Sequence, residues 1–146
     1  MSDFTPTPYI LDSSVLVDVA RGDADLIGFL QDFDRAGHSL IIPSLTAAGA
    51  LLDSQGLPDA QALLTGLAAF ERTTVAPLDG IHQAAKLAAM VNLMSSTELN
   101  SFDAHTAAIA DVAICPILTL KASMWASLSS TLDAPLHIIE IADPDQ

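Results

Sequence analysis

Short apolar runs alternate with longer amphipathic stretches along the chain. Five runs of apolar and β-branched residues, bounded by Pro, Gly or polar residues, cover residues 9–11, 38–42, 73–77, 116–120 and 137–141. Such runs are typical of buried strands. Apolar positions at helical spacing between them predict helices over 15–20, 44–52, 59–70, 81–94, 103–113 and 122–128, and one that Asp23 or Asp25 caps and Gly37 ends.

Strands that alternate with helices in this way predict βαβ units and a mostly parallel sheet. We therefore expect a three-layer α/β/α fold around a central five-stranded sheet. No repeat, low-complexity segment or linker divides the sequence, which predicts a single domain over residues 1–146, with residues 1–7 and 142–146 as frayed tails.

The composition is that of a very apolar globular protein. Hydrophobic residues make up 51% of the 146 positions, charged residues 16%, and the mean hydropathy is +0.45. This excludes a disordered chain, and no apolar run approaches the ~18 uninterrupted residues of a membrane span. So much apolar surface predicts a homo-oligomer, with a dimer as the simplest form.

The formal net charge is −13, with 18 acidic residues against 5 basic ones. Binding to nucleic acid depends on Lys and Arg that neutralise phosphates, so we do not expect this chain to bind DNA on its own. An acidic exterior also keeps an apolar protein dispersed. A polar N-terminus and a single cysteine, Cys115, favour the cytoplasm.

Asp12 is the first candidate for chemistry. It directly follows the apolar run at residues 9–11 and would lie at the carboxyl end of a strand, where open α/β sheets bind their ligands. Asp is also among the best helix N-caps, and this stretch taken alone favours a cap that satisfies the free N–H groups of the next helix. Asp103 takes a similar place at the start of a later helix.

Five segments in this order together resemble a known family. They read Leu-Asp-Ser-Ser-Val-Leu-Val-Asp at 11–18, Ile-Ile-Pro-Ser-Leu-Thr-Ala-Ala-Gly-Ala-Leu-Leu at 41–52, Val-Ala-Pro-Leu-Asp at 75–79, Ser-Phe-Asp-Ala-His-Thr-Ala-Ala-Ile-Ala at 101–110 and Pro-Ile-Leu-Thr-Leu-Lys at 116–121. Their layout resembles the PIN domain, in particular the single-domain ribonuclease toxins of the VapC type, over nearly the whole chain.

The resemblance implies a five-stranded parallel sheet with a site at its carboxyl edge. In that family, about four acidic side chains bind Mg²⁺ or Mn²⁺, which activates water to cleave RNA. Clustered carboxylates raise one another's pKa and repel unless a cation neutralises them. The resemblance also implies a small antitoxin as a protein partner.

The family's acidic residues carry over only in part. Asp12 and Asp103 match two of the four positions as catalytic and metal-binding residues, whereas Gly49 stands where a Glu is expected and Lys121 where an Asp is expected. Three other acids are candidate helpers, and three hydroxyls are candidate supports: Asp18, Asp53 and Asp79, and Ser13, Ser14 and Thr119.

Lys121 suggests a hypothesis about this change. An ammonium that points between Asp12 and Asp103 would neutralise both carboxylates and exclude a metal ion. The alternative is a solvated lysine at the start of a helix. Trp125, among apolar residues at helical spacing, is interpreted as a core or dimer-interface anchor rather than a platform for stacking bases.

Three functions stay open from the sequence. The first is a degenerate PIN-like domain with weakened or lost ribonuclease activity that acts through protein–protein association and needs no cofactor. The second is an active VapC-type endoribonuclease that uses Mg²⁺ or Mn²⁺ at Asp12 and Asp103 to cleave RNA. The third is an unrelated α/β binding module in which every carboxylate is a helix cap.

Overall fold

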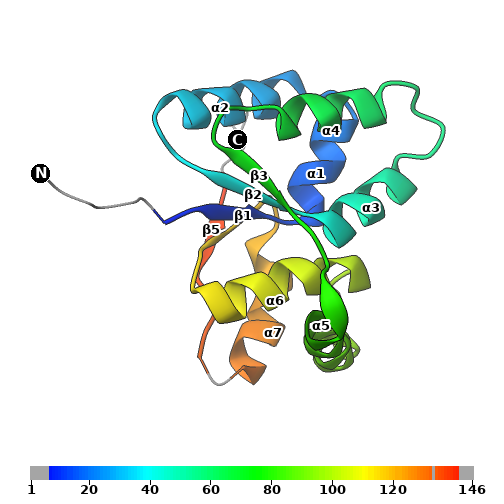
Figure 1. The fold of residues 1–146 in the computed structure, drawn as a ribbon, viewed down its shortest axis with the longest axis vertical. Coiled ribbons are helices and arrows are strands. Elements are labelled where there is room, and N and C mark those ends of the chain that lie inside the picture. Colours follow the sequence, from blue (N-terminus) through cyan, green and yellow to red (C-terminus); the bar gives the residue numbers. More distant parts are fainter. Residues whose placement is uncertain (1–6, 133, 142–146) are drawn as a thin grey trace, which may run out of the picture.

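The computed structural model describes residues 7–132 and 134–141, and its centre is a sheet of five parallel strands (Figure 1). The strands are β1 (Tyr9–Leu11), β2 (Leu40–Pro43), β3 (Thr73–Ala76), β4 (Ile117–Thr119) and β5 (Ile138–Glu140), in the order β3-β2-β1-β4-β5. The three-layer α/β prediction is confirmed. Except for Thr7, the predicted tails lie outside the described residues.

The helices follow the predicted ranges with small shifts. They are α1 (Ser13–Ala20), α2 (Ala24–Arg35), α3 (Ser44–Asp53), α4 (Ala60–Ala68), α5 (Gly80–Met94), α6 (Ala104–Ala113) and α7 (Ala126–Thr131). Two 3₁₀ turns, η1 (Ser101–Asp103) and η2 (Ala122–Trp125), precede α6 and α7. The helix predicted over 122–128 is therefore a 3₁₀ turn followed by a short α-helix. Within the described ranges, no helix is long and apolar enough to cross a membrane.

Two apolar clusters hold the layers together. Helices α1 to α4 cover one face of the sheet, and α5 to α7 cover the other (Figure 1). Because side chains alternate along a strand, neighbours in β1 serve different faces: Leu11 joins the cluster of the first layer and Ile10 that of the second. Both residues are fully buried, which places β1 at the centre of the domain.

The strand order creates a switch point beside β1. The chain runs outward from β1 through β2 to β3, and then returns to the other side for β4 and β5. Connections on the two sides of β1 lead away from each other, so a crevice opens beyond the carboxyl ends of β1 and β4. Asp12 follows β1 directly and therefore lies at this crevice.

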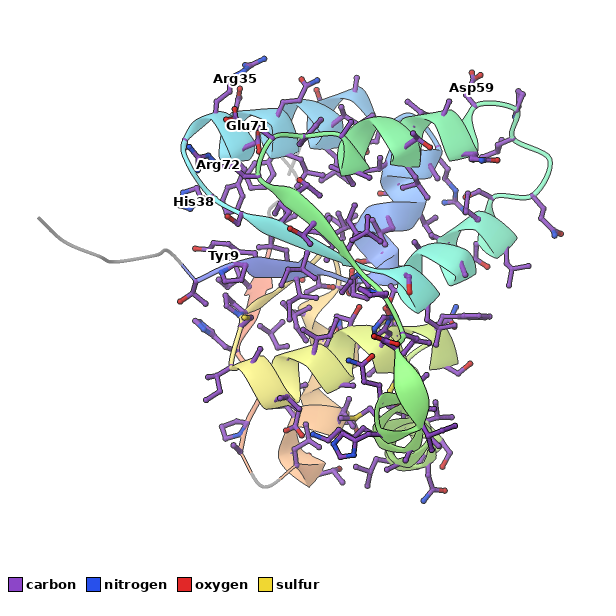
Figure 2. All side chains as sticks on the ribbon, viewed as in Figure 1. Tyr9, Arg35, His38, Asp59, Glu71 and Arg72 are labelled. Atoms are coloured by element: carbon purple, nitrogen blue, oxygen red, sulfur yellow. The ribbon has the colours of Figure 1, made fainter. Side chains whose placement is uncertain are left out.

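The opposite, amino-terminal edge of the sheet is closed by aromatic packing. Tyr9 and His38 lie together at this edge (Figure 2), with ring centroids 5.7 Å apart. Phe33 stacks on His38 at 4.2 Å and meets the edge of Tyr9 at 4.8 Å. Because these rings fill the amino-terminal edge, we expect a ligand-binding site at the carboxyl edge.

The predicted helix caps are confirmed in part. The side chain of Asp23 accepts a hydrogen bond from the N–H of Leu26 and caps α2. Ser44 is the first residue of α3, whose N-cap Pro43 makes no side-chain hydrogen bond. Asp79 stands at the N-cap of α5 without a side-chain cap bond, and its backbone N–H donates to Gln83 Oε1.

Candidate functional site

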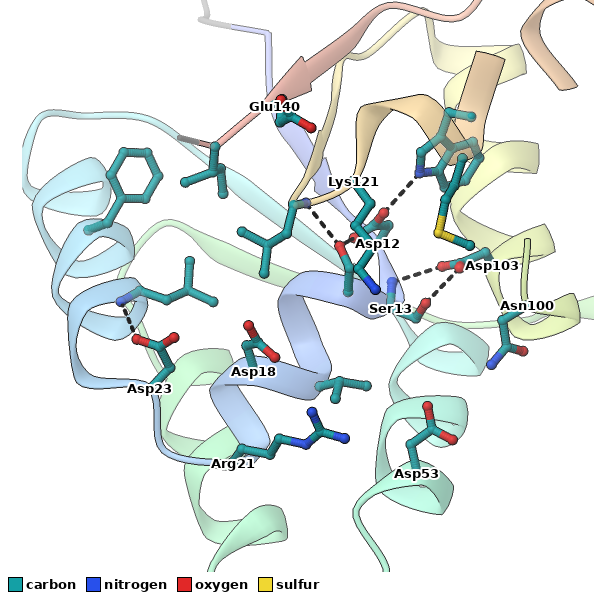
Figure 3. Close-up of a pocket in the computed structure, with 18 of the residues that line it drawn as sticks. Asp12, Ser13, Asp18, Arg21, Asp23, Asp53, Asn100, Asp103, Lys121 and Glu140 are labelled. Atoms are coloured by element: carbon teal, nitrogen blue, oxygen red, sulfur yellow. Dashed lines mark hydrogen bonds between the residues drawn. The ribbon is translucent and has the colours of Figure 1, made fainter. Parts of the chain in front are cut away.

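A cleft of about 1300 Å³ lies at the carboxyl edge of the sheet (Figure 3). The end of β1 forms its base, α1 and α2 form one wall, and the end of α3, the segments around η1 and η2 and the end of β5 form the rest. Asp12 and Asp103, the two acids that the sequence singled out, both line it.

Asp12 is buried, with 3% of its surface exposed. Its Oδ1 accepts hydrogen bonds from Ser14 Oγ at 2.6 Å and from the N–H of Val15 at 3.2 Å. Its Oδ2 accepts a hydrogen bond from Trp125 Nε1 at 2.8 Å. The helix-cap interpretation of Asp12 is therefore correct, but capping occupies only one of its two oxygens.

Asp103 reaches the same place from the other end of the sequence. It is also 3% exposed, and it ends the turn η1. Its Oδ1 accepts from the N–H of Ser13 at 2.8 Å, and its Oδ2 accepts from Ser13 Oγ at 2.6 Å. Ser13 follows Asp12 in the chain, so one residue joins the two acids.

Burial is the main reason why the pKa of Asp103 rises to about 7. The nearby carboxylate of Asp12 raises this pKa further, and the two hydrogen bonds from Ser13 oppose the rise. Two carboxylates held together away from water thus need a proton, a donor or a cation to compensate them.

Ser14 and Thr119, predicted as supporting hydroxyls, join the end of β4 to this cluster. Ser14 Oγ accepts from the N–H of Leu120 at 2.9 Å and lies 3.3 Å from Thr119 Oγ1. Thr119 Oγ1 in turn accepts from the backbone N–H of Lys121 at 3.0 Å. In the described structure these hydroxyls fix the geometry of the crevice.

A second hydroxyl network, which the sequence analysis missed, positions the loop of Asp103. Thr106 Oγ1 donates to the carbonyl of Leu11 at 2.9 Å, and Thr46 Oγ1 lies 2.9 Å from Thr106 Oγ1. Thr46 Oγ1 also bonds the carbonyl of Phe102 at 2.9 Å. Both threonines are fully buried. Their only sequence signal is a hydroxyl residue on the inner face of a predicted helix.

Gly49 lies directly beneath the ring of Phe102. A Cβ added at Gly49 would stand 2.5 Å from Phe102 Cβ and 2.6 Å from Phe102 Cγ. Real Cβ atoms do not approach so closely, so position 49 accepts no side chain unless Phe102 moves. Where the resemblance leads one to expect a glutamate, this protein has an aromatic ring.

The ion pair expected of Lys121 does not form. Lys121 lines the cleft but is exposed. Within the described residues, an ion pair shorter than 4.0 Å joins Arg35 to Asp32, and Lys121 forms none. A long ammonium side chain keeps its hydration more cheaply at the surface than between buried carboxylates. Ser13, Ser14 and Trp125 compensate the two acids instead.

The candidate helper acids do not complete a metal site. Asp18 and Asp53 line the cleft (Figure 3). Asp79 is exposed and is not among the residues that line it. In the parts of the chain that the structure describes, no group of three or more His, Cys, Asp or Glu is arranged to hold a metal ion. Because Gly49 and Lys121 stand where two of the expected acids would be, the residues present do not fit the cluster of acids that the family resemblance implies.

No protein-family model and no curated protein sequence matches this chain. Several solved structures do match the fold of this chain. A chain of VapBC2 from Rickettsia felis, solved bound to a DNA fragment from their promoter, superposes with a TM-score of 0.60 at 12% identity, covering 90% of this chain and 97% of that one. PAE2754 from Pyrobaculum aerophilum superposes with a TM-score of 0.52 at 18% identity, covering 92% and 83%.

The chain has a PIN-like fold. At these identities the likeness establishes the fold and not the chemistry. The chemistry of this PIN-like domain depends on the residues at its own site.

The raised pKa of Asp103 predicts a pH dependence of stability. Its pKa is 3.8 ordinarily and about 7 in the folded protein, so between these values the folded state binds more protons than the unfolded state. Asp103 therefore makes the free energy of unfolding fall as the pH rises through this window. Urea unfolding at several pH values should show this fall in the wild type and a flatter profile in Asp103→Asn. Parallel profiles would contradict it.

The contact beneath Phe102 predicts the effect of a methyl group at position 49. Gly49→Ala should lower the free energy of unfolding by about 1–3 kcal/mol, because Phe102 must move to admit the methyl group. The matched control is Gly66→Ala in α4, where nothing lies within 4 Å and alanine favours the helix by roughly 0.5–1 kcal/mol. Equal effects of the two substitutions in urea unfolding would argue against close packing at Gly49.

Proposed function

We propose that this protein is a PIN-like domain that has lost metal-dependent ribonuclease activity and acts by associating with other protein chains. One observation carries the proposal. All four oxygens of Asp12 and Asp103 accept hydrogen bonds from groups of the chain itself. The two acids that match the family's site thus serve here as the centre of an internal hydrogen-bond network.

Metal-ion chemistry supports the same conclusion. Mg²⁺ requires near-octahedral oxygen coordination and gives up its water molecules reluctantly. Each oxygen of Asp12 and Asp103 already accepts a hydrogen bond at 2.6–2.8 Å, which leaves at most one lone pair per oxygen for a metal ion. Both acids are only 3% exposed, so a hydrated ion has little access to them. Gly49 and Lys121 add no oxygen ligand.

An active enzyme is the second candidate, for one specific reason. Asp12 and Asp103 meet at the carboxyl edge of a PIN-like sheet and face a cleft of about 1300 Å³. If this site is active, Mg²⁺ or Mn²⁺ at the two acids would supply hydroxide for cleaving RNA, with Asp18 and Asp53 on the cleft wall as helpers.

The charge of the cleft suggests the chemistry of a partner. Nine of its lining residues are acidic and two, Arg21 and Lys121, are basic; the acidic residues are Asp12, Asp18, Asp23, Asp25, Asp32, Asp53, Glu98, Asp103 and Glu140. A basic protein segment complements such a surface. The likeness to VapBC2 supports a small antitoxin in the cytoplasm as this partner, with any DNA contacted by the complex rather than by this chain alone.

Helix α5 is the surface that best suits a second copy of the chain. It contains no Asp or Glu over Gly80–Met94, although the whole chain has 18 acidic residues. Its buried residues are Met90 and Met94, and Ile81 is 85% exposed. Two copies with a net charge of −13 each repel one another. An apolar helix without acids is where they can approach at the lowest electrostatic cost.

The ribonuclease proposal can be tested with Mn²⁺ and a mixed RNA set. We expect the wild type to give no calorimetric signal for binding of micromolar Mn²⁺ and to cleave RNA no faster than Asp103→Asn. The carboxylate oxygens are already engaged, so the substitution has no bound metal to remove. Cleavage by the wild type that disappears in Asp103→Asn would establish the active enzyme instead.

The association through α5 can be tested by placing a charge on its exposed face. Ile81→Glu should convert a dimer to a monomer in sedimentation equilibrium, because the carboxylate would be desolvated at the contact. Ile114→Glu is the matched control, since Ile114 is 83% exposed and follows α6 rather than lying on α5. A monomeric wild type, or equal dissociation by both substitutions, would rule out a dimer through α5.

A further inference from the structure

The single tryptophan of the chain makes an unusual contact. Trp125 is fully buried at the end of η2, and its indole N–H donates to Asp12 Oδ2 at 2.8 Å across 113 residues of sequence (Figure 3). Both residues line the acidic cleft. The indole therefore occupies a carboxylate oxygen at the edge of the sheet where α/β folds bind their ligands.

The indole differs in kind from the serine hydroxyls at this site, and it is the donor to Asp12 Oδ2. A serine hydroxyl has lone pairs as well as a proton, so it can rotate and accept a bond when a cation approaches. Indole Nε1 only donates, and its N–H points a partial positive charge at the oxygen that a cation would need. Trp125 therefore takes one of the two lone pairs of Asp12 Oδ2, and unlike a hydroxyl it cannot turn to coordinate an approaching cation.

Trp125 is also held firmly in place. It belongs to the buried cluster of the second layer, together with Ile10, Ile117 and Leu128, all of which are fully buried. Moving the ring away from Asp12 would open a gap in this cluster, and buried aromatic side chains are costly to displace. Side-chain rotation of Trp125 is therefore no simple route to a free Asp12.

We propose that Trp125 is an autoinhibitory contact that keeps divalent metal ions off Asp12. The inference rests on the proposed loss of metal binding and names the residue that enforces it. Its indole N–H holds Asp12 Oδ2 while Ser13 holds both oxygens of Asp103. The missing acids at positions 49 and 121 reduce the number of metal ligands, and the hydrogen bond from Trp125 weakens the metal affinity of Asp12, one of the two acids that remain.

Calorimetric titration with Mn²⁺ tests the proposal in Trp125→Phe, which keeps an aromatic ring in the core and removes the N–H. We expect Trp125→Phe to bind Mn²⁺ at least about tenfold more tightly than the wild type, the equilibrium equivalent of losing a hydrogen bond to a charged group. Adding Asp12→Asn to this variant should abolish the gain. Leu128→Val is the matched control, because it loosens the same apolar cluster without touching the N–H, and it should bind Mn²⁺ as the wild type does.

A second replacement guards against a variant that fails to fold. Trp125 is the only tryptophan, so biosynthetic incorporation of 3-benzothienylalanine changes this residue alone, and it exchanges the N–H for sulfur at nearly constant shape. This protein should show the same gain in Mn²⁺ binding. No gain in either folded protein, or an equal gain in Leu128→Val, would overturn the role of Trp125 and leave the proposed function standing. Micromolar Mn²⁺ binding by the wild type would instead overturn the proposed function itself.

Discussion

Two carboxylates buried side by side are the constraint on which the arrangement at the carboxyl edge depends. Asp12 and Asp103 are each almost inaccessible to water, and each acid needs compensation for the hydration that it has lost. Ser13 donates two hydrogen bonds to Asp103, whose pKa is raised to about 7, so that a proton can neutralise it. Asp12 accepts hydrogen bonds from Ser14, Val15 and Trp125. The donors come from α1 and from η2, and the acids follow β1 and end η1, so the hydrogen bonds tie together segments from across the chain.

The parallel sheet explains why these segments meet. Since β1 lies between β2 and β4, the turns that follow β1 and β4 converge on one crevice. The buried threonines Thr46 and Thr106 then fix the loop that carries Asp103 to the end of β1. Trp125 reaches the same point from the second layer. A site built in this way is rigid, because each of its donors is also part of the core or of a helix end.

A PIN-like fold does not by itself settle the chemistry of its edge. In this protein the ring of Phe102 fills the space above Gly49, and the indole of Trp125 holds one oxygen of Asp12. The cleft remains large and strongly acidic, whereas α5 is apolar and lacks acids. The carboxylates of the cleft repel the phosphates of an RNA backbone.

The sequence by itself determined the architecture and the two central acids. The five strands and most helix ranges follow from local periodicity, and Asp12 and Asp103 were found because each stands next to a predicted element. Only the tertiary structure decided what compensates these acids. Lys121, predicted to do so, is exposed, while Trp125 donates to Asp12, 113 positions away. Phe102 in turn fills the space at Gly49, 53 positions away. Spacing along a chain reports which face of an element a residue occupies. It does not report which distant side chain fills the space opposite, because that depends on how the layers pack.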